Sequence, residues 1–149
     1  MVAIYVDADA CPVKDEVIRV AARHGLKTLM VSDGGIRPYD DPLVELVIVA
    51  PGMDAADHWI AEHIGADDIA VTNDIPLAAK CVAVGAAVLR PNGEELTEKS
   101  IGMALAKRDL MTSLRDAGQI GGGGPPPFSK RDRSNFLSAL EVAAQRKAR

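Results

Sequence analysis

Aspartate residues recur in this sequence soon after short apolar runs, where their carboxylates could act together. Asp7 and Asp9 follow the first run, in the segment Asp-Ala-Asp-Ala-Cys-Pro-Val. Asp57 lies one helical turn after Asp54, which follows the third run, and Asp74 closes the segment Thr-Asn-Asp after the fourth. Two carboxylates about 4 Å apart repel by about 4 kcal/mol at an effective dielectric constant of about 20, unless a cation lies among them. The pattern therefore indicates a cation site, with these four aspartates as candidate catalytic residues.

The type of ligand favours Mg2+ or Mn2+ as the cofactor, because both ions prefer hard oxygen ligands. A zinc site would need closely spaced cysteines or histidines. Cys11 and Cys81 are 70 positions apart, and His58 and His63 are five apart. The C-terminal glycine run ends in prolines rather than in Gly-Lys-Ser/Thr, which excludes a Walker-type phosphate loop.

Four other aspartates have simpler structural interpretations. Asp54 is expected to cap the start of a helix with its side chain. Asp33, in Ser-Asp-Gly-Gly, is typical of a turn. Asp67 and Asp68 precede the fourth apolar run, so we expect them at the opposite edge of the fold.

The elements that must position these carboxylates alternate along residues 1–90. Apolar runs predict strands at residues 2–6, 27–31, 44–49, 69–72 and 86–89, and amphipathic segments predict helices at residues 13–24, 54–64 and 76–84. Uniformly apolar strands that alternate with helices indicate an α/β protein with a parallel sheet covered on both faces. In such a sheet, ligands bind beyond the carboxyl ends of the strands, where the strand order reverses.

The last third of the chain has a different pattern. Thr97 can cap a helix that runs to about residue 117, and a last helix is expected from about residue 129 or 132 to 145. Residues 121–127 are four glycines followed by three prolines, a composition that excludes regular structure. We expect one domain over residues 1–149, in which residues 97–149 form a helical appendage that contains this connector.

Composition and charge limit the class of protein. Hydrophobic residues make up 48% of the chain and charged residues 26%, as in ordinary globular domains. The longest uncharged apolar stretch, residues 46–53, is shorter than the roughly 18–20 residues that span a bilayer. We therefore expect a cytoplasmic protein without a membrane partner.

The net charge of −4 hides an asymmetry. Residues 1–75 carry 5 basic and 14 acidic side chains, whereas residues 76–149 carry 12 basic and 7 acidic side chains. This split favours an acidic site in the first half and an anion-facing surface in the second. Ser32 and Asn73 could hydrogen-bond to metal-bound water or to phosphate. The basic candidates for contact with a phosphate backbone are Lys80, Arg90, Arg108, Arg115, Lys130, Arg131 and Arg133.

Several motifs resemble those of the YaiI/YqxD family of uncharacterised bacterial proteins, over essentially the whole chain. They are residues 7–13 (Asp-Ala-Asp-Ala-Cys-Pro-Val), 56–57 (Ala-Asp), 72–79 (Thr-Asn-Asp-Ile-Pro-Leu-Ala-Ala), 90–93 (Arg-Pro-Asn-Gly), 108–111 (Arg-Asp-Leu-Met), 114–115 (Leu-Arg), 132–133 (Asp-Arg) and Phe136. That family is grouped with PIN-like domains, which are metal-dependent ribonuclease folds. The resemblance implies a three-layer αβα fold with strand order 3-2-1-4-5. It also implies a metal site made by Asp7, Asp57 and Asp74, with Asp9 as a fourth member.

Three functions are consistent with these residues. The first is an Mg2+- or Mn2+-dependent nuclease that hydrolyses phosphodiesters in RNA or another single-stranded nucleic acid. The second is a phosphatase or phosphotransferase of the haloacid dehalogenase type, with Asp7 as nucleophile, Asp9 as acid/base and Lys80 beside the phosphoryl group. The third is a non-catalytic PIN-like module that binds RNA. Aromatic residues make up only 3% of the chain, so base stacking is not the expected source of affinity.

Overall fold

The fold is built around one six-stranded sheet. The computed structural model describes residues 2–34, 36–52, 54–118 and 127–147. The strands lie in the order β3-β2-β1-β4-β5-β6. Their bounds are Ala3–Asp7 (β1), Lys27–Ser32 (β2), Val44–Ile48 (β3), Ile69–Val71 (β4), Ala87–Leu89 (β5) and Glu95–Leu96 (β6). The predicted α/β class and the order 3-2-1-4-5 are confirmed.

One strand departs from the prediction. β6 pairs with β5 in the antiparallel direction and was not expected from the sequence. It is two residues long, too short to show an alternating pattern, and it follows β5 after a tight turn. The sheet is therefore mixed, with β1 to β5 parallel and β6 as an antiparallel edge strand.

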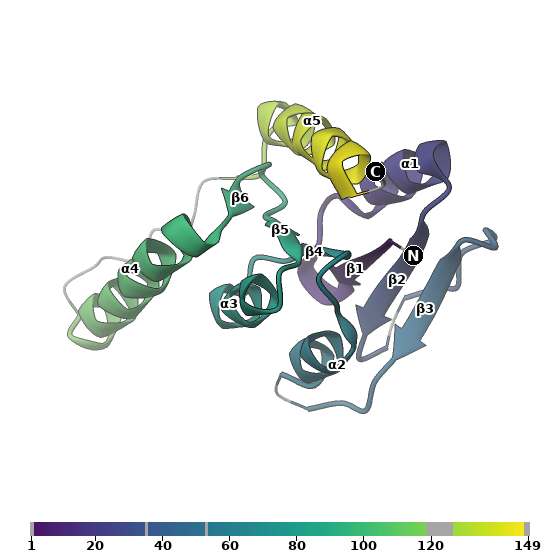
Figure 1. Cartoon of the computed structure of the whole chain (residues 1–149). Coiled ribbons are helices and arrows are strands. Elements are labelled where there is room, and N and C mark those ends of the chain that lie inside the picture. The colour runs from purple at the N-terminus through teal and green to yellow at the C-terminus, as the bar shows by residue number, and fades with distance from the viewer. Residues whose placement is uncertain (1, 35, 53, 119–126, 148–149) are drawn as a thin grey trace.

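Helices cover both faces of the sheet, which gives the predicted three layers. α1 and α5 lie on one face, and α2 and α3 lie on the other (Figure 1). The helices are Lys14–His24 (α1), Ala55–His63 (α2), Ile75–Ala83 (α3), Glu98–Asp116 (α4) and Lys130–Lys147 (α5), and a short 3-10 helix, η1, spans Ala8–Ala10. No helix in the described ranges is long and apolar enough to cross a membrane.

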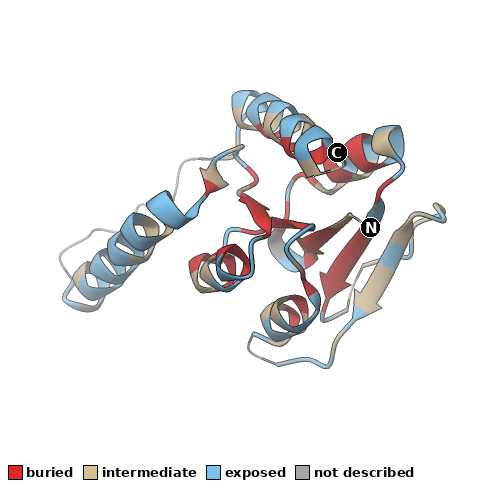
Figure 2. Cartoon of the chain, in the orientation of Figure 1, coloured by how far each residue is buried: buried red, intermediate tan, exposed pale blue. Residues whose placement is uncertain are grey.

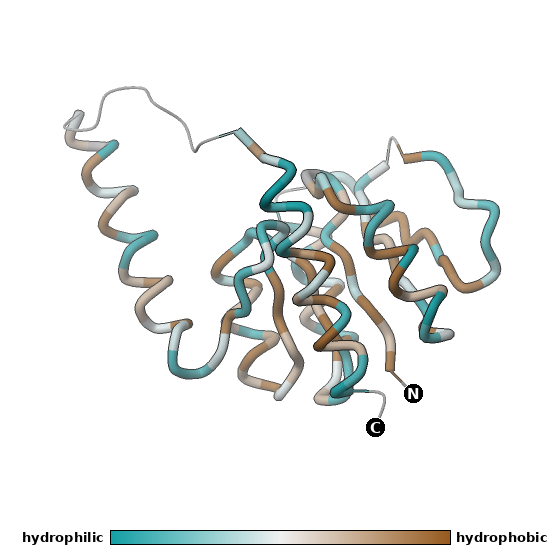
Figure 3. The backbone as a smooth tube through the Cα atoms, turned by 90° about the horizontal axis from the view of Figure 1, so that it is seen from above, coloured by the Kyte–Doolittle hydropathy of each residue, from teal (hydrophilic) through white to brown (hydrophobic). Residues whose placement is uncertain are grey.

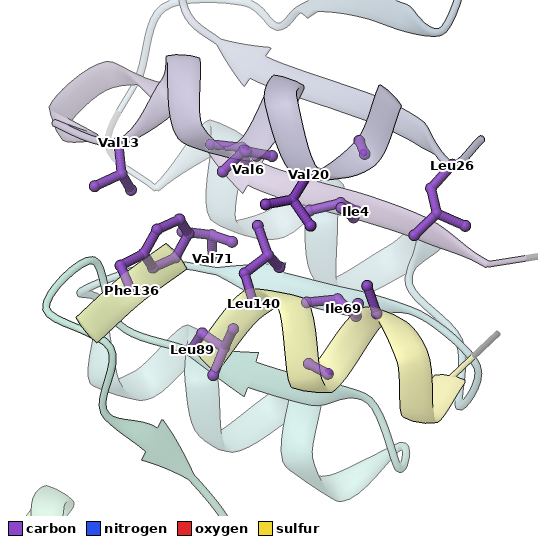
Figure 4. Packing of buried hydrophobic residues seen from close by; sticks show 14 of the residues in the cluster. Ile4, Val6, Val13, Val20, Leu26, Ile69, Val71, Leu89, Phe136 and Leu140 are labelled. Carbon is purple, nitrogen blue, oxygen red and sulfur yellow. The ribbon is translucent and has the colours of Figure 1, made fainter. Parts of the chain in front are cut away.

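The C-terminal helix α5 is part of the hydrophobic core. Its Phe136 and Leu140 are fully buried and pack with Val20 of α1 and with Ile4 and Val71 of the sheet (Figure 4). α5 is therefore not an appendage, because together with α1 it forms the helical layer on one face of the sheet. The predicted Gly/Pro-rich connector at residues 121–127 lies outside the described residues, except for Pro127.

α4 projects from this body. Thr97 caps it as predicted, in a reciprocal pair of hydrogen bonds with Ser100. Its first half packs on α3 and β6, with Ile101 and Leu105 partly buried, whereas most residues of its second half are exposed (Figure 2). Seen from above, α4 extends away from the other helices (Figure 3).

The other helix ends follow the sequence in part. Gly25 ends α1 in the left-handed conformation, as expected. α2 begins directly after Asp54, but the Asp54 side chain makes no capping hydrogen bond, so that prediction was wrong. Its φ of 63° turns the residue out of the extended conformation that a capping side chain needs.

A charged pair joins the N-terminal and C-terminal helices on the α1/α5 face. Glu16 of α1 is 4% exposed. The Arg133 guanidinium donates to both carboxylate oxygens of Glu16, with 2.8 Å between Nη1 and Oε2, and to the carbonyl oxygen of Pro12 at 3.2 Å. The same guanidinium lies 5.1 Å from the centre of the Phe128 ring. Arg133, predicted to contact phosphate, thus has structural partners.

We expect the Arg133→Ala substitution to lower the free energy of unfolding by about 2–3 kcal/mol. The reason is that a buried carboxylate left without its partner is costly, although the partial exposure of Arg133 limits the loss. Chemical denaturation measures the effect. The matched control is Arg131→Ala, an exposed position in the same turn, where a change within about 0.5 kcal/mol is expected. Equal losses in the two variants would contradict this role for Arg133.

Candidate metal centre

The candidate centre lies where the strand order reverses, between β1 and β4. After β1 the chain continues to β2 on one side, and β4 pairs with β1 on the other. Asp7 is the last residue of β1, and Asp74 follows β4 by three residues. Because the two strands are parallel, both residues lie at the carboxyl edge of the sheet, as the sequence predicted.

A buried threonine ties these two positions together. The Thr72 hydroxyl donates to Asp7 Oδ2 at 3.2 Å and accepts from the backbone N–H of Asp74 at 2.9 Å. Asp74 is also the N-cap of α3, since its Oδ1 accepts from the Leu77 N–H at 2.9 Å. One Asp74 oxygen is thereby held by the helix start, which fixes the direction of the carboxylate.

Three carboxylates converge beside this point. Asp54, Asp57 and Asp74 each offer one oxygen, and these oxygens lie within 4.8 Å of one another. Asp57 sits in the first turn of α2, and Asp54 directly precedes that helix. Asp54 is the non-glycine residue with a positive φ in the described part of the chain, a conformation that costs of order 1 kcal/mol and is common at functional sites.

The electrostatics of the group are those of crowded like charges. The pKa of Asp57 is raised to about 7, first by burial, next by a hydrogen bond shared with Asp74, and then by the charges of Asp74, Asp7 and Asp54. The pKa of Asp7 is also raised, mainly by burial, although the Thr72 hydrogen bond opposes the shift. No ion pair found within the described ranges involves any of these four aspartates. The charge of the group is thus not balanced by a nearby lysine or arginine.

A pocket of about 210 Å3 opens next to the carboxylates. Its lining residues come from the ends of β1, β4 and β5 and are Asp7, Cys11, Val71, Thr72, Asn73, Asp74 and Pro91. Burial raises the pKa of the Cys11 thiol to about 11. At neutral pH Cys11 is therefore a neutral wall of the pocket and not a thiolate nucleophile.

Asp9 is not part of the group of three converging carboxylates, and it is hydrogen-bonded to Ser32. The Ser32 hydroxyl donates to Asp9 Oδ1 at 2.5 Å, and the other Asp9 oxygen accepts from the Asp33 N–H at 3.2 Å. Ser32 is fully buried and also accepts from the Gly34 N–H. These contacts join the end of β1 to the loop after β2, beside the site.

The predicted basic residues are spread more widely. Arg90 reaches the site's edge, where its Nε–H donates to Asn73 Oδ1 at 3.2 Å. Lys80 is exposed in the last turn of α3, the end that points away from the carboxyl edge. The remaining candidates lie on the C-terminal helices, namely Arg108 and Arg115 on α4 and Lys130, Arg131 and Arg133 on α5.

Two residues of the site were not among the predicted functional residues. Asp54 was interpreted as a helix cap, and no sequence signal shows that its backbone is left-handed. Thr72 was not assigned a role, although its place directly after β4 is a usable signal for a residue that orients carboxylates. Asp68, in contrast, lies as expected at the opposite edge, where its two oxygens accept from the N–H groups of Ala3 and Gly65.

Fold and site together define an α/β protein with an acidic group, able to hold a metal ion, at the carboxyl edge of a mostly parallel sheet. The sequence profile described as "Uncharacterized BCR, YaiI/YqxD family" matches residues 5–146. The chain belongs to this family, as its motifs predicted.

Named relatives are similar over nearly their full length. A UPF0178 protein of Rhodopseudomonas palustris (strain BisB18) is 60% identical over 143 residues, which cover 96% of this chain and 92% of the relative. A UPF0178 protein of Ruegeria pomeroyi is 59% identical over 152 residues, which cover 99% of each chain. One from Bradyrhizobium sp. (strain ORS 278) is 58% identical over 145 residues, which cover 97% of this chain and 88% of the relative. No solved structure matches this chain.

The raised pKa values of Asp57 and Asp7 predict that stability falls with rising pH. Between about pH 4 and pH 7 the folded protein binds more protons than the unfolded chain, because the unfolded carboxyls have already ionised. In a chelator, denaturation at pH 5 is therefore expected to require more urea than at pH 7.5. The Asp57→Asn variant should show a smaller difference, with higher stability than the wild type at pH 7.5. A pH-independent wild-type midpoint would contradict the crowding of these charges.

Proposed function

We propose that this protein is a metal-dependent phosphodiesterase that hydrolyses RNA or another single-stranded nucleic acid. The observation that carries the proposal is the convergence of Asp54, Asp57 and Asp74, whose ligand oxygens lie within 4.8 Å of one another at the carboxyl edge. These residues come from two different strand-to-helix connections. Their approach is therefore a product of the fold and not of a single acidic loop.

The donor set supports Mg2+ or Mn2+ as the ion. The group offers carboxylate oxygens only, which are the ligands that these ions prefer. Burial, the hydrogen bond shared with Asp74 and the neighbouring carboxylate charges together raise the pKa of Asp57. Asp54, Asp57 and Asp74 would hold the ion, with Asp7 next to them. When bound, such an ion polarises a phosphoryl oxygen and lowers the pKa of a bound water.

The chain's own residues supply the geometry. Thr72 sets Asp7 relative to Asp74 through its two hydrogen bonds, and the helix cap fixes the Asp74 carboxylate. Asp9 and Ser32 brace the neighbouring loop. In this proposal Thr72, Asp9 and Ser32 act by orienting the metal-binding carboxylates. A variant that lacks these hydrogen bonds would keep the carboxylates but would hold them in the wrong orientation.

Charge and topology support a nucleic-acid strand as the substrate. Residues 76–149 carry the excess of basic side chains. Within this part of the chain, Arg90 reaches Asn73 at the edge of the site, and Arg133 at the start of α5 reaches the Pro12 carbonyl in the segment that follows β1. Phosphates of a single strand would be attracted to this side while one phosphodiester lies at the carboxylates. The low aromatic content favours contacts to the backbone over stacking of bases.

Metal binding is the first test. The Asp74→Asn substitution keeps an N-cap residue on α3, since asparagine caps as well as aspartate, but removes the charge. Isothermal titration with Mn2+ is expected to show at least about a tenfold loss of affinity in this variant. The control is Asp67→Asn, an exposed aspartate at the opposite edge, which should bind Mn2+ as the wild type does. Equal affinity in wild type and Asp74→Asn would refute the assignment.

Turnover is the second test. With Mn2+ and a single-stranded RNA, we expect cleavage that Asp57→Asn lowers by at least about 100-fold, because an ion that is poorly held stabilises the transition state less. Cleavage is followed on denaturing gels with a labelled strand. Mn2+ binding without cleavage of RNA or single-stranded DNA would instead favour a non-catalytic nucleic-acid-binding module.

A further inference from the structure

The turn between β5 and β6 is a tightly bonded element beside the pocket. The Arg90 N–H donates to the Glu94 carbonyl at 2.8 Å, and the Gly93 N–H donates to the Arg90 carbonyl at 2.9 Å. The Glu94 N–H also donates to Asn92 Oδ1 at 2.9 Å. The backbone of Arg90 is therefore held at a constant place at the edge of the site.

The turn is also fixed against the C-terminal helix. Gly93 has a φ of +94°, and a Cβ atom at this position would lie 2.6 Å from the carbonyl carbon of Asn135. Only glycine allows this approach between the turn and α5. Because α5 is anchored in the core, the turn cannot shift away from the sheet without disturbing that packing.

From this fixed base the Arg90 side chain orients Asn73. The Nε–H of Arg90 can donate only to the oxygen of the Asn73 amide, and the distance is 3.2 Å. The amide nitrogen, which carries two N–H donors, is thereby turned away from Arg90. Asn73 lines the pocket together with Asp74, its neighbour in sequence.

An anion at this place needs such donors. The carboxylates of Asp7 and Asp74, which also line the pocket, repel a phosphate and can act on it only through a cation. N–H donors of an amide or a guanidinium bind phosphate oxygens directly. Arg90 also has Glu94 Oε2 at 3.6 Å from its Nη1, so its charge is partly balanced and the guanidinium is held in place.

We propose that Asn73 and Arg90 form an anion subsite for a phosphate group, next to Asp74. Asn73 donates to a non-bridging phosphate oxygen, and Arg90 is the positioning residue that orients the Asn73 amide. This inference rests on the function proposed above and deepens it. The pocket of about 210 Å3 is smaller than the roughly 300–1,000 Å3 of sites that enclose a whole small molecule. The subsite therefore takes the phosphate alone, and the nucleosides on either side remain outside the pocket, which makes recognition tolerant of base sequence.

The test measures binding of inorganic phosphate by isothermal titration, with and without Mg2+, in the wild type and four variants. The Asn73→Ala and Arg90→Ala variants are each expected to lower the phosphate affinity about tenfold. If Arg90 acts through Asn73, the double variant loses no more than Asn73→Ala alone. The matched control is Arg23→Ala in the last turn of α1, at the end away from the carboxyl edge, which also removes an arginine that is paired with a carboxylate, and it should leave phosphate binding unchanged.

The outcomes separate this inference from the proposed function. Asn73 is exposed, so its variant should keep the wild-type thermal midpoint and Mn2+ affinity. Wild-type phosphate affinity in Asn73→Ala would overturn the subsite, even if Mn2+ binding and RNA cleavage are intact. Additive losses in the double variant would overturn the positioning role of Arg90. Phosphate binding that depends on Asn73 in a protein without Mn2+ affinity would support the subsite and refute the proposed metal-dependent function.

Discussion

The structure depends on holding mutually repelling carboxylates together at one edge of the sheet. Parallel strands deliver their carboxyl ends to the same edge, and the helices that follow begin there. The helix starts offset part of the repulsion, because the positive ends of the α2 and α3 dipoles face Asp57 and Asp74. This gain, about 0.3–1 kcal/mol for each helix, is smaller than the repulsion of about 4 kcal/mol between two close carboxylates. The remainder favours a bound cation.

Two residues at the carboxyl edge of the sheet are held in unfavourable states, and the packing of the hydrophobic core compensates for their cost. Asp54 adopts a left-handed backbone, and the pKa of Asp57 is raised to about 7, so both residues are held in states that they would not adopt alone. On the face of the sheet covered by α1 and α5, Phe136 and Leu140 are packed without exposure to solvent. Strain at a binding edge and close packing elsewhere are the usual division in proteins that position charged ligands.

The C-terminal helix connects these two regions. Arg133 anchors the start of α5 to the buried Glu16, and the α5 backbone at Asn135 touches Gly93 in the turn after β5. Through these contacts, α5 restrains both the start of α1 and the turn that carries Arg90. A segment distant in sequence thus contributes to the geometry of the acidic edge.

The sequence by itself determined the class of fold, the five parallel strands and the edge at which the aspartates meet, because apolar periodicity is a local property and the alternation of strands with helices along the chain implies parallel strands. It also determined that Asp7, Asp57 and Asp74 share that edge. The tertiary structure alone decided which oxygens converge: Asp54 joins Asp57 and Asp74, whereas Asp9 turns to Ser32 and Arg133 turns to Glu16. Side-chain partners depend on distances between segments far apart in the chain and on backbone angles such as that of Asp54, and neither is encoded in residue spacing.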